Sequence, residues 1–305
     1  MMPKQEKPKV LISACLNGLS YRYNGTEAND ELVNKIKPLF ELVNVCPEVG
    51  IGLPIPRKPI RLHFENNRFR VIQEESNLDL TKKLEDFSQN FLKNLKDICG
   101  CILKAKSPSC GIANAKFYKD NKIAGRTYGI FARTIKENLP YLPIIDEGRL
   151  RNKELFWEFL VKTFLLFRFY NSKSDIKNLI EFHSKYKYIL MGLSQKYLKL
   201  LGQILAKHTP KNFKETLNNY EYYLKEILKQ SFRRPNLANA LTHIFGHISK
   251  YLSKKEKENF LKIIEKYRKL KIDFPTATEM LKIYVLRFED SYLQSQYFFE
   301  PFPEI

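Results

Sequence analysis

Cysteine is the residue type in this chain whose positions most clearly suggest chemistry. Five cysteines occur, all within the first 110 residues: Cys15, Cys46, Cys99, Cys101 and Cys110. An odd number is atypical of a disulfide-bonded secreted scaffold, and the crowding of thiols into one region indicates metal or cluster chemistry. The last of the five stands in the sequence SPSCG (107–111), a Ser/Pro/Gly turn that suits the presentation of one thiolate better than packing.

Expected strands lead to three of these cysteines. The short apolar runs at 10–14, 40–46 and 99–104 are each followed or closed by one of Cys15, Cys46 and Cys110. A helix is expected between the second and third strands, over 79–98, because apolar residues recur there at helical spacing. Strand, helix and strand in alternation predict an α/β fold with a Rossmann-like, mostly parallel sheet. Ligands gather at the carboxyl ends of such strands, so these three thiols are expected to meet.

The other two cysteines belong to the third expected strand. Cys99 and Cys101 lie two residues apart in an apolar run, which places them on one face of a strand. A free cysteine in that setting commonly behaves as a small hydrophobic residue. We therefore expect Cys99 and Cys101 to be core residues and not ligands.

The domain organisation follows from a change of character after about residue 170. The first domain is predicted over 1–168, and its proline-rich stretch at 47–62 is expected to be a shaped loop. The second is predicted over 174–305 as an all-α domain of five or six helices, because only helical periodicity and few glycines occur there. The fold class is therefore α/β in the N-terminal half, with an all-α domain at the C-terminal end.

The charge suggests a polyanionic partner. The formal net charge is +19, from 52 Lys and Arg against 33 Asp and Glu, and both halves are basic. Such a surplus favours nucleic acid, although a proteome rich in lysine would give the same number. Lysines alternate with Tyr186, Tyr188 and Tyr197 in the helical half, a pattern that suits RNA and also suits an ordinary amphipathic helix.

No segment predicts a membrane or an export route. No apolar stretch reaches the roughly 20 residues of a membrane helix, since Lys162 and Arg168 interrupt the longest candidate. The first ten residues, MMPKQEKPKV, contain no apolar core of a signal peptide. We therefore expect a cytoplasmic protein without a membrane partner.

Three converging thiols without a fourth leave two kinds of centre open. A structural zinc site usually has four ligands, whereas a 4Fe–4S cluster held by three cysteines leaves one iron open to a substrate atom. Ligand number alone does not separate that cluster from a three-cysteine zinc hydrolase. His63 is the only histidine in the first 150 residues, which weakens the zinc interpretation.

At this point the motifs resemble those of a known family. SACLNG with RYNG, then CPEVGIGLPIPRKP, LKAKSPSCG, YGIFAR and IIDEGRLRN, in this order over about 8–165, resemble the thiouracil desulfidase family. The segments RPNLANALTHIFGH and YLQSQYFFEPFPE resemble the helical domain often fused to it. For the fused form, the resemblance implies 4Fe–4S-dependent, non-redox removal of sulfur from 4-thiouridine in tRNA. Uridine and sulfide are the products, and the helical domain would help to hold the RNA.

The resemblance also implies roles for individual residues. Cys15, Cys46 and Cys110 would ligate three irons of the cluster and leave the fourth open. Glu48 would be a catalytic residue in proton transfer; the alternative is a loop carboxylate paired with a nearby arginine such as Arg57 or Arg61. The hydroxyl of Ser107 would be catalytic as a proton relay, or would only cap its turn.

Four further residues within the motifs are candidates for substrate binding: Asn17, Arg22, Arg57 and Lys104. The three basic side chains would contact the phosphate or the base, and a solvated or salt-bridged role is equally compatible with the sequence. Asn17 would also shape the loop that follows Cys15.

Three alternatives remain open at this stage. A desulfidase acting on free thiouracil or thiouridine monophosphate would use the same chemistry but would not need a basic second domain. A non-catalytic RNA-binding protein with a structural cluster would bind tRNA without sulfur loss. A three-cysteine zinc enzyme would be recognised by metal analysis.

Overall fold

The computed structural model describes residues 6–305, and the chain divides into two compact units. The first extends to Phe167 and also takes in Ile305, and the second spans Arg168–Glu304, so the division falls inside helix α5 (Lys153–Asn171). The predicted domains place the change at 168–174. Residues 1–5 lie outside the described residues. They include the start of the predicted first domain and half of the segment in which no export signal was predicted.

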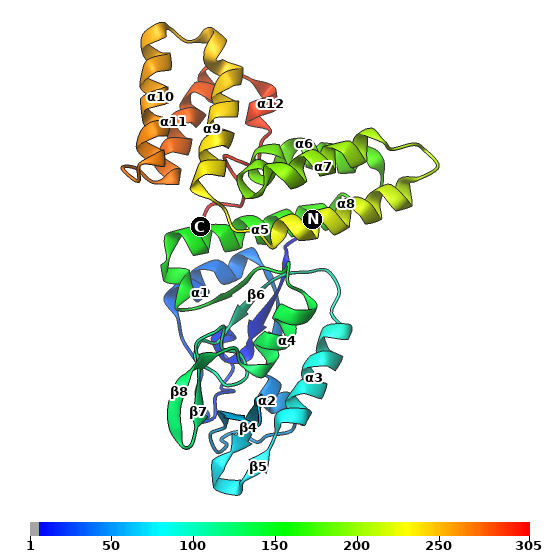
Figure 1. The fold of residues 1–305 in the computed structure, drawn as a ribbon, viewed down its shortest axis with the longest axis vertical. Helices are drawn as coiled ribbons and strands as arrows, with labels where there is room; N and C mark the ends of the chain where they lie inside the picture. The colour runs from blue at the N-terminus through cyan, green and yellow to red at the C-terminus, as the bar shows by residue number, and fades with distance from the viewer. Residues whose placement is uncertain (1–5) are drawn as a thin grey trace, which may run out of the picture. The chain divides into compact units, whose positions relative to one another are not determined.

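The first unit contains a four-stranded parallel sheet in the order β2-β1-β6-β9. One of its two central strands, β6, is labelled in Figure 1. Its strands are β1 (Lys9–Ser13), β2 (Glu41–Val45), β6 (Ile98–Leu103) and β9 (Ile144–Asp146). Every residue of β6 is buried, as expected for the central region of a sheet covered on both faces. The predicted α/β class with a parallel sheet is confirmed, and each of the three predicted strands lies within one residue of an observed one.

The helices of this unit are α1 (Glu31–Ile36), α2 (Pro47–Gly50), α3 (Thr81–Lys93), α4 (Ile130–Asn138) and the first part of α5. The predicted helix at 79–98 is observed as the shorter α3: Asp79 and Leu80 belong to β5 and to the helix cap, and the helix ends at Lys93, five residues before the predicted end. At Gly100 of β6, a Cβ would lie 2.8 Å from Thr163 Oγ1 and 3.2 Å from the Phe159 ring. The missing side chain therefore allows α5 to pack closely on β6.

A second, five-stranded sheet was not predicted. It has the order β5-β4-β3-β7-β8, and only the β3–β7 pair is parallel. Its strands are β3 (Arg61–Glu65), β4 (Arg68–Gln73), β5 (Leu78–Asp79), β7 (Ala115–Lys119) and β8 (Lys122–Thr127). The expectation of a continuous loop at 47–62 was wrong at both ends, where α2 and β3 form. Charged residues alternate with apolar ones in these strands, and the apolar side packs against α3 and α4 around Leu62, Val71, Leu84 and Ile130.

The second unit is helical, as predicted, with more helices than the five or six expected. Residues 168–304 contain seven further α-helices: α6 (Ile176–Leu193), α7 (Gln195–Ala206), α8 (Phe213–Leu228), α9 (Arg234–Ile248), α10 (Lys254–Arg268), α11 (Phe274–Arg287) and α12 (Ser291–Gln294). The extra count comes partly from the four-residue α12. Large aromatic side chains such as Tyr186, Tyr220 and Phe169 fill its core.

Among the described helices, α5 included, none combines the length and the apolar character that a membrane crossing requires.

Candidate functional site

A cavity of about 520 Å³ opens in the first unit beside the carboxyl ends of β1, β2 and β6. Its volume lies in the range of small-ligand pockets. The cysteines Cys15, Cys46 and Cys110 all line it, because their strands are parallel neighbours in the order β2-β1-β6. Of the other predicted site residues, those that line it are Arg22, Glu48, Arg57, Lys104 and Ser107.

Two of the three thiols sit on short helical turns directly after strands. Cys15 belongs to a 3-10 turn (Ala14–Asn17) that begins where β1 ends, and this turn ends at Gly18 with φ of 85°. Cys46 is the N-cap residue of α2, and the nearby backbone N–H groups of Val49 and Glu48 lower the pKa of its thiol, against the larger effect of burial. The sequence places both cysteines at strand ends, and the local turns aim them into the cavity.

The turn that carries Cys110 is fixed by two sets of backbone hydrogen bonds. The Ser107 hydroxyl accepts hydrogen bonds from the N–H groups of Ser109 and Cys110, both at 3.1 Å. The amino end of α4 adds bonds from Ile130 N to Pro108 O (3.1 Å) and from Phe131 N to Ser109 O (2.9 Å). The turn-capping alternative for Ser107 is therefore observed, while its hydroxyl proton remains available to a ligand in the cavity.

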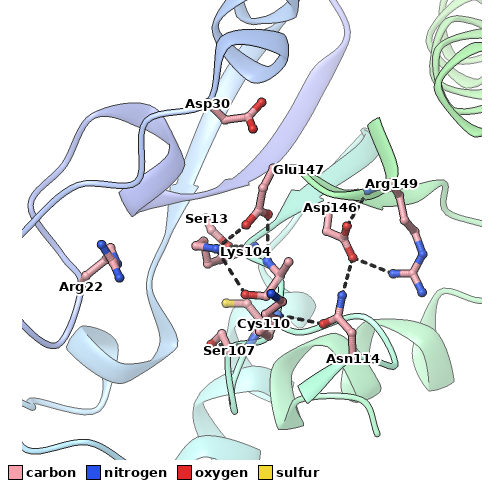
Figure 2. A network of polar contacts seen from close by, with 12 residues as sticks. Ser13, Arg22, Asp30, Lys104, Ser107, Cys110, Asn114, Asp146, Glu147 and Arg149 are labelled. Carbon is pink, nitrogen blue, oxygen red and sulfur yellow. Dashed lines mark hydrogen bonds and ion pairs between the residues drawn. The ribbon is translucent and has the colours of Figure 1, made fainter. Parts of the chain in front are cut away.

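A network of polar side chains lies behind this turn, and the sequence analysis had predicted no role for it (Figure 2). Asp146, at the end of β9, accepts hydrogen bonds from Asn114 Nδ2 (2.8 Å) and Arg149 Nη1 (2.7 Å). Asn114 Oδ1 accepts from Lys106 N at 2.8 Å, and Arg149 Nη1 also donates to Ile112 O at 2.7 Å. Asp146 and Arg149 belong to the IIDEGRLRN motif, which could have indicated this role. The polar residues of the motif hold both ends of the loop that carries Cys110.

Burial and mutual proximity make the three thiols hard to ionise. The pKa of Cys15 is raised to about 11, first by burial and then by Cys46. Burial also raises the pKa of Cys46, and it raises that of Cys110 well above its ordinary value, with further increases from Cys46 and Cys15. All three thiols line the same cavity.

Glu48 is held by partners from two other segments. Its Oε2 accepts from Arg57 Nε at 2.8 Å, and its Oε1 accepts from Ser109 Oγ at 3.0 Å. The ion pair is well shielded from water, with 3% of the Arg57 side chain and 13% of the Glu48 side chain exposed. Of the two alternatives for Glu48, the structure shows the pair with Arg57, and the carboxylate also lines the cavity.

The other three residues predicted to bind substrate each have a different hydrogen-bond or salt-bridge partner. Arg22 Nη1 donates to Thr26 Oγ1 at 2.9 Å within its own loop. Lys104 forms a salt bridge with Glu147, whose other oxygen accepts from Ala105 N. Asn17 donates to Asn44 Oδ1 at 2.9 Å and does not line the cavity, an arrangement typical of a loop-shaping residue.

Cys99 and Cys101 are core residues, as predicted. They are 1% and 0% exposed within β6, and neither lines the cavity. Their burial raises the pKa of Cys99 to about 12 and that of Cys101 further, so both thiols stay neutral in the core.

The donor set in the cavity fits an iron–sulfur cluster. Three crowded thiols favour the neutral form unless cationic metal compensates their charge, and metal coordination deprotonates thiols. Arg57 Nη1, on the wall of the same cavity, is buried without a hydrogen-bond partner in residues 6–305, so it could donate to a bound group. A 4Fe–4S cluster takes each thiolate on a separate iron.

For two tyrosines of the lysine–tyrosine pattern in the second unit, the structure shows the packing of an ordinary amphipathic helix. Tyr186 and Tyr188 are fully buried; Tyr186 Oη accepts from Arg168 Nη1 at 2.8 Å, and Tyr188 Oη lies 3.0 Å from His247 Nε2. Aromatic spacing alone did not distinguish a core tyrosine from an exposed one.

A different surface of that unit presents unpaired positive charge. Lys255, Lys262 and Lys266 are exposed on α10 and share a face, being seven and four residues apart. The buried residues of α10, among them Phe260 and Tyr267, lie on its other side. In the described part of the chain, none of these three lysines has a salt-bridge partner. We call them the α10 lysine stripe.

Comparison with known proteins divides the chain in a similar way. Residues 10–147 match the family described as 2-thiouracil desulfurase. Residues 187–303 match a second family, described as a protein of unknown function (DUF1722).

Two curated relatives and one solved structure are similar to this chain. YbbK of Bacillus subtilis is 32% identical over 139 residues, which cover 42% of this chain and 89% of YbbK. YbgA of Escherichia coli is 24% identical over 128 residues, which cover 42% of this chain and 76% of YbgA. The 4Fe-4S-dependent thiouracil desulfidase TudS superposes with a TM-score of 0.39 at 25% identity, covering 50% of this chain and 98% of its own. That superposition is too loose to establish a shared fold.

Proposed function

The chain belongs to the 2-thiouracil desulfurase family through residues 10–147, and on that premise we propose that it is a 4Fe–4S-dependent desulfidase of thiolated pyrimidines. The observation that carries this proposal is the meeting of Cys15, Cys46 and Cys110 in one cavity, at the ends of three adjacent parallel strands. In the net reaction, water replaces the sulfur of a thiocarbonyl, and hydrogen sulfide leaves. No electrons are gained or lost.

The cluster would be held by the three cysteine thiolates. When bound, it supplies an open iron that acts as a Lewis acid on the thiocarbonyl sulfur. The remaining chemistry belongs to the side chains around it. Glu48 presents a carboxylate to the cavity at a fixed position, where it can take a proton from water or return one to the departing sulfur.

Other side chains of the cavity would orient the substrate. The Ser107 hydroxyl accepts two backbone N–H groups and can donate its own proton to a ring atom of the pyrimidine. Lys104 lines the cavity wall while paired with Glu147, and Arg22 adds positive charge there, which suits a substrate that carries phosphate.

We propose 4-thiouridine in tRNA as the substrate. The chain has a net charge of +19, and the second unit carries the α10 lysine stripe, which extends about 16 Å along the helix. Exposed lysines without acidic partners are suited to phosphates of an RNA backbone. A base inside folded tRNA leaves its stack at a cost of about a few kcal/mol, which contacts to the backbone would offset.

The test is anaerobic. The full chain, reconstituted with iron and sulfide, is mixed with bulk bacterial tRNA, and the near-ultraviolet absorbance of 4-thiouridine is followed together with sulfide release. Loss of the band with stoichiometric sulfide is the expected result. Parallel arms contain free thiouracil and 4-thiouridine monophosphate, and faster turnover there than with tRNA would overturn the tRNA assignment. A band that persists in all arms, with tRNA bound and iron present, would leave a non-catalytic RNA-binding protein.

A further inference from the structure

Arg57 connects segments that are far apart in the sequence and that all border the cavity. Its backbone N–H donates to Tyr23 O at 2.7 Å, and its Nη2 donates to Tyr21 O at 2.8 Å. Both carbonyls belong to the loop that follows Cys15. Its Nε donates to Glu48 Oε2 at 2.8 Å, two residues beyond Cys46. One side chain therefore joins the loops of two cysteines.

Glu48 extends this connection to the third cysteine. Its second oxygen accepts from Ser109 Oγ at 3.0 Å, and Ser109 directly precedes Cys110. The chain of contacts Tyr21–Arg57–Glu48–Ser109 thus crosses all three cysteine-bearing segments. Cys46 Sγ also lies 3.9 Å from Tyr21 O, so the carbonyl that anchors Arg57 borders one of the thiols.

The geometry points to Arg57 as a positioning residue: we propose that the Arg57–Glu48–Ser109 clamp holds the three cysteine-bearing segments in register and so determines how firmly the cluster is retained. The inference rests on the cluster of the proposed function. Under this proposal Arg57 acts through its contacts with other protein residues, whereas the sequence motif had suggested that it contacts the substrate.

The chemistry of the guanidinium explains why an arginine serves here. A planar fork reaches a carboxylate and a carbonyl at once, whereas a lysine ammonium offers a single point charge. The ion pair is largely buried, so removal of one partner leaves the other charge poorly compensated. Groups that orient metal ligands typically change metal affinity by about 10–100-fold when they are lost.

The experiment measures cluster retention without substrate. Each variant is reconstituted anaerobically with iron and sulfide, its iron and acid-labile sulfide per chain are determined, and the visible absorbance is followed after a ferrous chelator is added. Arg57→Met and Glu48→Ala should lose the cluster about 10–100-fold faster than the wild type. The double variant should be no worse than either single one, since each breaks the same clamp.

Matched variants separate the clamp from charge and from catalysis. Arg61→Met removes a cation from the same cavity wall, but Arg61 pairs with Glu74 and not with a cysteine-bearing segment, so cluster retention should be unchanged. Glu48→Gln should also retain the cluster, because the amide oxygen can accept from Arg57 and the amide nitrogen can donate to Ser109 Oγ. The same variant should turn over slowly, since it cannot take up a proton.

Chelator resistance of Arg57→Met within twofold of the wild type would overturn the clamp. If circular dichroism shows that the metal-free Arg57→Met variant does not fold, the clamp is tested with Arg57→Lys and Ser109→Ala instead. Retention of the cluster at the wild-type level in both of these variants would also overturn the clamp. Wild-type protein that takes up no iron contradicts the proposed cofactor. Wild-type protein that holds iron but releases no sulfide contradicts only the proposed activity, and the clamp is still tested by its variants.

Discussion

Gly129, at the amino end of α4, lies directly against the backbone of Ser109 in the turn that carries Cys110. A Cβ at position 129 would fall 2.5 Å from both the carbonyl carbon and the carbonyl oxygen of Ser109. Gly129 N also donates to Gly111 O at 2.8 Å. The glycine of the YGIFAR motif is therefore required for close approach between α4 and a cysteine-bearing turn.

Gly129→Ala should consequently displace this turn. We expect a loss of about 1–3 kcal/mol in the free energy of unfolding, as for overpacked interiors, together with lower iron content after reconstitution. Thermal unfolding and iron analysis measure the two effects. Gly246→Ala in α9 is the matched control: its Cβ would meet nothing within 4 Å, so stability should be unchanged or higher. Equal behaviour of the two variants would contradict the close-approach argument.

Cysteine substitutions should fall into two classes. Cys15→Ala, Cys46→Ala and Cys110→Ala should each remove most of the bound iron and all desulfidation, because each thiolate would hold one iron. Cys101→Ala should keep the iron content of the wild type, since Cys101 is buried in β6 away from the cavity. Iron and sulfide analysis after anaerobic reconstitution is the measurement. Full iron content in any of the first three variants would remove that cysteine from the ligand set.

The α10 lysine stripe is predicted to contribute to tRNA binding. Replacing Lys255, Lys262 and Lys266 together with alanine should weaken tRNA binding and reduce the slope of log affinity against log salt by about 1 per lysine. Binding is measured by titration of labelled tRNA at several salt concentrations.

The control for this prediction removes the same amount of charge. Lys173, Lys225 and Lys229 of the second unit are paired with Glu221 or Glu226, so alanine at these three positions lowers the net charge equally without removing unpaired cations. Its salt slope should match that of the wild type. A similar loss in both triple variants would mean that net charge, and not the stripe, governs binding.

The burial of His183 should make the stability of the second unit depend on pH. Burial, with a smaller contribution from Lys187, lowers the pKa of His183 from 6.5 to about 4, and its Nδ1 lies 3.1 Å from Tyr220 Oη. The unfolded chain binds a proton near pH 6.5 and the folded chain does not. Stability is therefore complete above pH 6.5 and declines as the pH falls towards 4.

The expected loss attributable to His183 is about 2 kcal/mol at pH 5. Urea unfolding of the wild type and of His183→Gln at pH 7.5 and pH 5 measures it. The glutamine variant should be less stable at pH 7.5, where it loses the packed imidazole, and should lose about 2 kcal/mol less than the wild type on acidification. Parallel pH dependence in the two proteins would show that His183 does not titrate as described.

The amino-acid sequence by itself determined the strands that precede Cys15 and Cys46, the one that leads to the Cys110 turn, and their parallel arrangement. Short β-branched runs alternating with a helix leave few topologies, and strand direction then brings their carboxyl ends to one edge. The core character of Cys99 and Cys101 followed from their shared face in an apolar strand.

Only the tertiary structure decided which polar groups meet. The sequence offered Arg57 and Arg61 equally as partners of Glu48, and the structure selects Arg57. Local pattern gave no information on the link of Glu48 to Ser109, 61 positions away, or on the attachment of the Cys110 loop to Asp146. The second sheet was missed because its strands are half exposed and carry many charged residues, a composition that is also typical of loops. Tyr186 and Tyr188 show the same limit: periodicity places a side chain on a helix, but the packing of neighbouring helices decides whether it is buried.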